Sequence, residues 1–383
     1  MDRRSRRLSG LGTTIFAEMS ALAARTGSVN LGQGFPDTDG PDVVIEAAVQ
    51  ALRSGRNQYA PGTGVPELRL AVAEHQRRRY DLELDPDSEV AVTTGATEAI
   101  AAAILGLVDP GDEVIVLEPY YDSYVAVLQM AGAVRRPVTL RAPDFRLPVE
   151  ELRAAVSDRT TTILLNTPHN PTGAVLTRDE LEAVAAVARE HDLVVVSDEV
   201  YEHLTYDVEH VPVATLPGMR ERTLTISSGG KTFSFTGWKV GWASGPAELV
   251  DAMVGAKQFL TYTSGSPLQP AIAEALRLGD DYFADFRAGM RARRDQLCEG
   301  LASVGLDVHV PDGTYFATTD IRPLGLEDGV EFCWSLPERA GVAAIPHQVF
   351  HDGDGGRSLV RWAFCKKPAV IDEGVSRLRR AFA

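Results

Sequence analysis

The sequence has few cysteines, no excess of positive charge and no long hydrophobic run, and each shortage excludes a class of protein. Only three cysteines occur among the 383 residues, namely Cys298, Cys333 and Cys365. They lie far apart and form no CxxC pair, so neither a disulfide framework nor a zinc site is indicated. A reducing compartment, the cytoplasm, is therefore the expected location.

Positive charge is outnumbered: 38 Lys and Arg stand against 53 Asp and Glu, which gives a formal net charge of −15. A chain this acidic has no overall attraction for nucleic acid or anionic lipid, so neither partner is expected. No apolar stretch approaches the roughly 18 residues of a membrane helix. Residues 1–7 (MDRRSRR) have the charges of a twin-arginine export signal. The segment that follows is interrupted by Gly10, Gly12 and Glu18, and it predicts an amphipathic helix instead.

What is present indicates a globular α/β protein. Apolar residues make up 44% and charged residues 24%, and the length suggests roughly two to three domains. The middle of the chain alternates short β-branched runs with helical stretches, which predicts a mostly parallel sheet covered on both faces. The seven strands are expected at 89–93, 113–117, 135–139, 161–165, 193–197, 223–226 and 241–244. Helices are expected at 97–107, 121–130 and 178–191, the last preceded by a capping box of Thr177 and Glu180.

After Pro270 the pattern changes and predicts a smaller α+β domain. Its elements are a long helix at 281–304, strands at 315–318, 342–345 and 359–362, and helices at 330–338 and 370–382. The expected division is an N-terminal segment that joins the small domain (1–40), a large domain (41–275) and a small C-terminal domain (276–383).

The most informative stretch, SSGGKT at residues 227–232, follows a predicted strand. Its Gly-Lys-Thr is shared with nucleotide-binding P-loops, but a P-loop needs a glycine where this chain has Thr225. The next residues, FSFTGW, do not predict the helix that a kinase or ATPase would need there. The competing interpretation is a strand-end lysine, Lys231, that forms a Schiff base.

Polar side chains also follow other predicted strands. Asp198 ends the apolar run of LVVVSDEVY, with Tyr201 three residues later. Ligands of open α/β sheets bind at the carboxyl ends of the strands, although such an acid can also be a helix N-cap. Asn166 and Asn170, in NTPHNPTG, offer amide donors that the neighbouring prolines hold in place, or else mark only a turn.

Two further features suggest anion binding. The helix start in TGATE, at 94–98, exposes backbone N–H groups that can hold a phosphate, as many α/β crossovers do. Arg361, within LVRWAF, is flanked by apolar residues, so it needs either a structural ion pair or a ligand carboxylate. No metal is expected, because the eight histidines lack ligand spacing and DGDGG lacks the acids of a calcium loop.

This set of groups is what pyridoxal phosphate chemistry requires. Asp198 would keep the pyridine nitrogen protonated, and Lys231 would hold the aldehyde and then move a proton. The motifs NPTG, SDEVY, GGKTF–TGWKVGW and VRWAF, in this order, resemble those of the fold-type I (class I/II) aminotransferases. The resemblance extends from VNLGQGFP to the Arg361 region. It is strongest toward the kynurenine/glutamine branch and toward bacterial enzymes assigned as N-succinyldiaminopimelate aminotransferases.

The resemblance implies a PLP-transferase fold of type I and assigns the cofactor residues. Lys231 is implied as the Schiff-base lysine and Asp198 as the partner of the ring nitrogen. The remaining cofactor contacts are implied for side chains or backbone around the ring and the phosphate: Tyr201 and Asn170 at the phenolic oxygen, Tyr121 stacked on the ring, and Ala96, Thr97, Ser228 and Lys239 at the phosphate.

It also implies the substrate contacts and the assembly. Arg361 and Asn166 would bind the α-carboxylate, with Gly34 approaching through its backbone and Phe16 lining the side-chain pocket. Tyr59 and Tyr262 would reach into the neighbouring subunit of a homodimer, toward its phosphate and its substrate pocket.

The implied activity is ping-pong transfer of an amino group from an amino acid to a 2-oxo acid. N-succinyldiaminopimelate and 2-oxoglutarate, a step of lysine biosynthesis, are the expected substrates. Kynurenine, glutamine or methionine transamination is the alternative, with β-elimination of cysteine S-conjugates as a side reaction. A non-catalytic regulator is disfavoured, because fewer than forty residues precede the cofactor domain.

Overall fold

The computed structural model describes residues 5–382, so residues 1–4 of the basic N-terminal stretch lie outside the described range. Its centre is a seven-stranded sheet in the order β2-β8-β7-β6-β5-β3-β4, in which only β8 runs antiparallel to its neighbours. The mostly parallel seven-stranded sheet is therefore confirmed. The strands are β2 (Val90–Thr93), β3 (Glu113–Glu118), β4 (Val134–Thr139), β5 (Thr160–Asn166), β6 (Val194–Asp198), β7 (Thr223–Ser228) and β8 (Gly241–Ser244).

Helices cover both faces of this sheet because successive strand residues point to opposite sides. In β3, Val114 and Val116 belong to the core under α4 (Gly95–Leu107), α5 (Asp122–Ala131) and α9 (Ala247–Lys257). Ile115 and Leu117 belong to the core on the other face, under α6 (Val149–Ala154) and α7 (Arg178–Glu190). The predicted capping box at the start of α7 is present.

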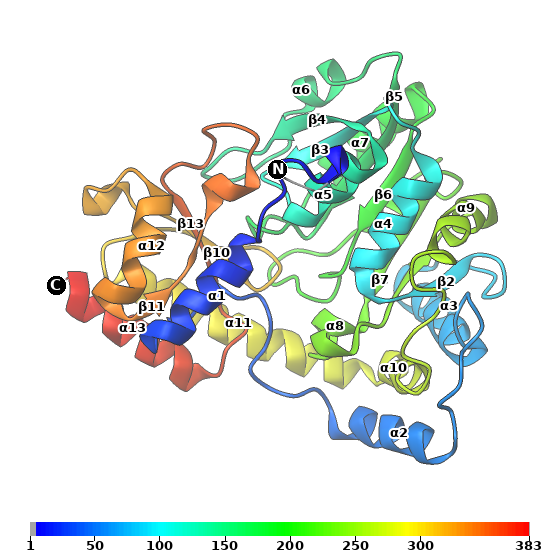
Figure 1. The fold of residues 1–383 in the computed structure, drawn as a ribbon, viewed down its shortest axis with the longest axis horizontal. Helices are drawn as coiled ribbons and strands as arrows, with labels where there is room; N and C mark the ends of the chain where they lie inside the picture. The colour runs from blue at the N-terminus through cyan, green and yellow to red at the C-terminus, as the bar shows by residue number, and fades with distance from the viewer. Residues whose placement is uncertain (1–4, 383) are drawn as a thin grey trace.

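A second, four-stranded antiparallel sheet lies beside the first and is covered by helices of its own (Figure 1). Its order is β12-β13-β10-β9, with β9 (Asp307–His309), β10 (Phe316–Asp320), β12 (Ile345–Pro346) and β13 (Leu359–Ala363). The helices near it are α1 (Ile15–Thr26), α11 (Asp280–Ala302), α12 (Gly329–Ala340) and α13 (Pro368–Phe382). Figure 1 shows the C-terminus at the outer end of α13, far from the seven-stranded sheet.

The single strand expected at 342–345 is wrong, because the chain changes partner at Ala344. Residues of β11 (Val342–Ala343) pair in parallel with β1 (Val29–Asn30), whereas β12 pairs with β13. The N-terminal segment is thereby bonded to the C-terminal part of the chain.

Six α-helices of the described residues were not predicted: α2 (Asp42–Arg53), α3 (Pro66–Tyr80), α6, the one-turn α8 (Gly229–Thr232), α9 and α10 (Gln269–Leu276). Among the described residues, no helix is both long and apolar enough to span a bilayer.

Strand register places the candidate site. Asn166 at the end of β5 lies opposite Asp198 at the end of β6, and Asp198 lies opposite Ile226 of β7. The carboxyl ends of these three strands meet at one edge of the large sheet, next to the start of α4. The loop before β10 and the strand β13 face the same edge, so two sheets contribute to one site.

Candidate active site

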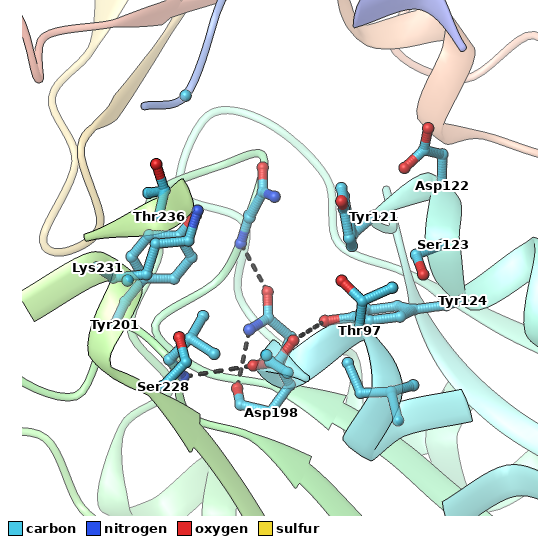
Figure 2. Close-up of a pocket in the computed structure, with 18 of the residues that line it drawn as sticks. Thr97, Tyr121, Asp122, Ser123, Tyr124, Asp198, Tyr201, Ser228, Lys231 and Thr236 are labelled. Carbon is cyan, nitrogen blue, oxygen red and sulfur yellow. Dashed lines mark hydrogen bonds between the residues drawn. The ribbon is translucent and has the colours of Figure 1, made fainter. Parts of the chain in front are cut away.

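A cavity of about 620 Å³ opens at this edge, and all but two of the residues expected at the site line it. Figure 2 shows Asp198 at one side of the cavity, Lys231 and Tyr201 on one wall, and Tyr121 across from them. The expected residues on its walls are Phe16, Gly34, Ala96, Thr97, Tyr121, Asn166, Asn170, Asp198, Tyr201, Ser228, Lys231, Lys239 and Arg361.

Asp198 is buried at the end of β6 and is held by two hydrogen bonds. Its Oδ2 accepts from the hydroxyl of Tyr124 at 2.6 Å, and its Oδ1 accepts from the backbone N–H of Val200 at 3.3 Å. Burial raises the pKa of Asp198 to about 6, while the Tyr124 hydrogen bond and the Lys231 charge act in the opposite direction. The side chain is therefore a carboxylate at neutral pH that favours a nearby cation.

Lys231 lies on the one-turn helix α8 (Gly229–Thr232), directly after β7. Its Nζ donates to the hydroxyl of Tyr315 at 2.9 Å. Burial lowers the pKa of Lys231 to about 8, helped by the charges of Arg361 and Lys239. An amine with this pKa has a far larger neutral fraction near physiological pH than an ordinary lysine, and the neutral form is the one that acts as a nucleophile or a proton acceptor.

One end of the cavity is suited to an anion. The first turn of α4 begins at Gly95, which has φ +71°, and a Cβ there would stand 3.3 Å from Nζ of Lys239. Ser228 and Thr236 line the same cavity. The helix start, the ammonium and two hydroxyls together form a cradle that matches a phosphate.

The opposite end holds Arg361, whose guanidinium is fully buried on β13. Its Nη1 donates to Oδ1 of Asn170 and its Nη2 to the carbonyl of Gly32, both at 2.9 Å, whereas its buried Nε has no partner among the described residues. The guanidinium carbon lies 4.0 Å from the ring centre of Phe316 and 4.9 Å from that of Phe16. No carboxylate of the described chain pairs with it, so a ligand carboxylate fits there.

The two asparagines are engaged differently. Asn166 donates through Nδ2 to the carbonyl of Asp198, and its Oδ1 accepts from the N–H of Asn170, both at 2.8 Å. Both ends of the Asn166 amide are thus used to hold the loop. Asn170 uses only its oxygen, toward Arg361, and its amide nitrogen remains a donor on the cavity wall.

Tyr59 and Tyr262 do not line the cavity and form what we term the exposed tyrosine pair. Their rings contact each other edge to face at 5.8 Å, and they are 83% and 48% exposed, respectively. The neighbouring Thr261 and Ser264 bond the hydroxyl of Thr94, just before α4, so the pair lies near the anion cradle.

Sequence reasoning missed Tyr124 and Tyr315, which bond Asp198 and Lys231 directly. Tyr124 lies three residues after Tyr121, one helical turn further along α5, and this spacing is a signal that could have found it. Tyr315 is brought in by the second sheet, and no local pattern indicates it.

One group outside the cavity has the chemistry of a metal site. The ligand atoms of His75, Glu202 and His203 lie within 4.8 Å of one another. The Nε2 atoms of the two histidines are 2.9 Å apart, and the Glu202 carboxylate already accepts from the hydroxyls of Tyr80 and Ser227. These are the distances and partners of a buried hydrogen-bond network.

The comparisons with known proteins agree with this geometry. The profile of the family "Aminotransferase class I and II" matches residues 26–378. A probable N-succinyldiaminopimelate aminotransferase of Mycobacterium tuberculosis is 53% identical over 97% of each chain, and a methionine aminotransferase of Escherichia coli is 40% identical over 98% of this chain and 97% of its own.

Solved structures give the same result. The N-succinyldiaminopimelate aminotransferase of M. tuberculosis superimposes with a TM-score of 0.97, covering 99% of this chain and 100% of that one at 53% identity. An aspartate aminotransferase of Thermus thermophilus reaches 0.92 at 37% identity, covering all of both chains. The cofactor that these findings imply is pyridoxal phosphate, whose aldehyde, pyridine nitrogen and phosphate correspond to the amine, carboxylate and anion cradle of the cavity. The chain belongs to the class I and II aminotransferases and has the fold of type I.

Proposed function

We propose that Lys231, Asp198 and the start of α4 hold pyridoxal phosphate, and that the enzyme transfers the amino group of N-succinyldiaminopimelate to 2-oxoglutarate. The observation that carries the proposal is the convergence of a buried amine, a buried carboxylate and an unpaired arginine on one cavity. Bound pyridoxal phosphate supplies an aldehyde that condenses with amines and a ring that accepts electrons from the α-carbon of an amino acid.

Each anchor has its own task in this proposal. The Asp198 carboxylate keeps a proton on the ring nitrogen, and the Tyr124 hydroxyl fixes the orientation of that carboxylate. The Tyr201 hydroxyl and the Asn170 amide would hold the phenolic oxygen of the cofactor, and Tyr121 would pack against its ring. The phosphate is bound by the first-turn N–H groups of Ala96 and Thr97, with Ser228 and Lys239.

Arg361 binds the substrate α-carboxylate, because its buried Nε and its aromatic surroundings leave the planar cation without an acidic partner in the chain. The carbonyls and glycines of residues 32–34 bring the backbone close to the same place, and a Cβ at Gly34 would meet Phe316 at 2.5 Å. Asn166 acts through Asn170, because its Oδ1 accepts a hydrogen bond from the backbone N–H of Asn170. With the carboxylate fixed, the α-proton of the amino acid is presented to Nζ of Lys231, which removes it and returns it.

The choice of substrate rests on the relative that is 53% identical, since Phe16 and the described side chains of the cavity are also compatible with methionine or kynurenine. A panel of amino donors and 2-oxo acids, followed at the pyridoxal and pyridoxamine absorbance bands, tests it. We expect the highest kcat/KM for N-succinyldiaminopimelate. Equal or higher values for methionine or kynurenine would replace this substrate and leave the aminotransferase activity intact.

The attachment of the cofactor has a separate test. Borohydride reduction of the loaded protein, followed by peptide mass analysis, should place pyridoxyl phosphate on Lys231. The variant Lys231→Ala should remain folded, take up no label there and lose at least about 10⁴-fold in rate, because the group that removes the proton is gone. A label on another lysine would overturn the assignment.

We further infer a homodimer in which the exposed tyrosine pair of one subunit completes the site of the other. Two large exposed tyrosines near the anion cradle, neither of which lines the cavity of its own chain, support this arrangement. We also propose the division into residues 41–275 and 276–383, with 1–40 joined to the latter; the two sheets and the β1–β11 pairing support it. A cytoplasmic location remains part of the same proposal.

A further inference from the structure

The hydroxyl of Tyr315 lies between the ε-amine of Lys231 and the backbone of the N-terminal segment. It accepts from Lys231 Nζ at 2.9 Å and donates to the carbonyl of Gly34 at 2.5 Å. We propose that Tyr315 is a positioning residue that holds the free amine of Lys231 in register for proton transfer. The inference rests on the function proposed above, in which that amine moves the α-proton.

The number of protons on the hydroxyl decides the direction of these hydrogen bonds. A phenol has one proton, and here a backbone carbonyl, which can only accept, takes it. The oxygen of Tyr315 can therefore only accept from the lysine. One N–H of Lys231 is directed at this oxygen, so the lone pair of the neutral amine points in another direction. The side chain of Lys231 also lines the cavity.

The phenol is held in place from all sides, as an orienting group must be. Tyr315 is fully buried, and its ring packs edge to face on Tyr201 at 5.2 Å and on Phe316 at 4.9 Å. Its carbonyl accepts from the N–H of Phe364 at 3.0 Å. The ring has no room to turn away from the amine.

The backbone before Tyr315 is fixed as well. Thr314 has φ +63°, a left-handed conformation, and its carbonyl accepts from the hydroxyl of Tyr206 at 2.5 Å. Its N–H donates to the carbonyl of Leu204 at 2.8 Å. Through these bonds the second sheet presents Tyr315 to a lysine that the first sheet carries.

The charge state suits an acceptor. Burial raises the pKa of Tyr315 well above its ordinary value, so the hydroxyl stays neutral. The other groups that act on the amine are Asp198 and Cys365, which favour its charged form, and Arg361 and Lys239, which oppose it. Among the described residues, Tyr315 is the one whose side chain hydrogen-bonds Nζ.

The same contact links two parts of the site. Gly32, two residues before Gly34, accepts from Arg361 through its carbonyl. The N-terminal segment therefore contacts Arg361 through the carbonyl of Gly32. It contacts Lys231 indirectly, through the carbonyl of Gly34 and the hydroxyl of Tyr315. This segment is therefore bonded both to the arginine of the carboxylate site and, through Tyr315, to the proton-transferring amine.

The test compares Tyr315→Phe with Tyr80→Phe in the holoenzyme. Each variant loses one tyrosine hydroxyl that bonds within the chain, but the hydroxyl of Tyr80 bonds Glu202 and neither the lysine nor the backbone around Tyr315. Borohydride labelling should reach Lys231 in both variants and in the wild type. If the wild type is not labelled there, the proposed function fails, independently of Tyr315.

For Tyr315→Phe we expect the half-reaction with an amino acid to slow about tenfold at its pH plateau, the change given by the loss of one hydrogen bond. The acidic limb of the pH profile should move to lower pH, because a lost acceptor leaves the ammonium form less stabilised. The cofactor-free variant should show the same displacement in the pH dependence of pyridoxal phosphate uptake, which reports the free amine without turnover. Tyr80→Phe should change neither pH dependence. Equal pH profiles and plateaus in the two variants would overturn the proposal.

Discussion

The inner wall of the cavity and the exposed tyrosine pair are built in opposite ways. On the inner wall, Asp198 and Arg361 are buried and fixed by hydrogen bonds from several elements of the same chain. Tyr59 and Tyr262 touch each other and solvent, with 83% of Tyr59 exposed. The chain therefore completes the polar interior of its site by itself and leaves the outer aromatic part unfinished.

The two regions differ in whether they bury charged groups, which costs free energy. Burial raises the pKa of Asp198 and lowers that of Arg361 to about 10, so both charged forms are less favourable there than in water. The exposed pair carries no such penalty. Substitutions on the inner wall should therefore affect both function and stability, while those in the pair should affect function alone.

The largest effect is expected for Arg361→Ala. Removing the cation from the carboxylate site should raise KM several hundredfold for every α-amino acid, on the order of 3 kcal/mol for a buried charged partner. Steady-state kinetics with several donors measure it. Arg322→Ala, an exposed arginine paired with Asp320, is the control and should stay near wild type. An unchanged KM for Arg361→Ala would move the carboxylate site elsewhere.

An intermediate effect, on stability, is expected for Asp198→Asn in the cofactor-free protein. Since the pKa of the folded form lies near 6, above the ordinary value of 3.8, the free energy of unfolding contributed by this group falls as pH rises from about 4 to 6. The variant should thus be more stable than wild type at pH 7.5 by about 1–3 kcal/mol, an advantage that shrinks toward pH 5. Urea unfolding at both pH values measures it, with the exposed Asp109→Asn as control. A variant no more stable than wild type would mean that the buried charge costs little.

The smallest effect is expected for Tyr59→Phe, which should weaken cofactor retention about tenfold through one lost hydrogen bond and leave the free energy of unfolding unchanged. Dialysis against pyridoxal phosphate buffers and urea unfolding give the two values.

Mixing two variant chains tests whether each site is shared between subunits. Lys231→Ala chains carry an intact Tyr59, and Tyr59→Ala chains carry an intact Lys231. If the sites are shared, subunit exchange between the two variants should create wild-type sites and raise the activity above that of either variant alone. No gain after verified exchange would mean that each site is complete within its own subunit.

The fold was predictable where the signal is local. All seven central strands begin within one residue of the expected position, because most of them are apolar β-branched runs bounded by turns. The helix α3 escaped because charged residues dilute its apolar periodicity. The helix α2 is amphipathic, so its pattern could have been found in the sequence. The split at Ala344 escaped because partner exchange depends on β1, more than three hundred residues earlier in the chain.

The site residues also divide into those that local sequence patterns indicate and those that only distant contacts bring in. Lys231, Asp198 and Asn170 sit at strand ends that chain order alone brings to one sheet edge. Tyr315 and the Gly32 carbonyl contact Lys231 and Arg361 only because the fold brings together segments that lie far apart in the sequence. Asn166 lines the cavity and also holds its own loop through both ends of its amide, which a list of donors does not reveal; its role at the substrate stays a prediction.

The aromatic surroundings of Arg361 have a consequence for the thermodynamics of binding. The ring centres of Phe316, Phe16 and Phe350 lie 4.0, 4.9 and 5.3 Å from the guanidinium carbon of Arg361. The side chain therefore has little rotamer freedom in the folded protein, before any ligand binds. An incoming amino acid does not have to immobilise a flexible arginine side chain, so the entropic cost of association is reduced. More of the contact enthalpy then contributes to the affinity. Calorimetry of a carboxylate inhibitor should therefore show a small entropic penalty, and replacing Phe316 by a smaller apolar residue should enlarge it while the charge stays the same.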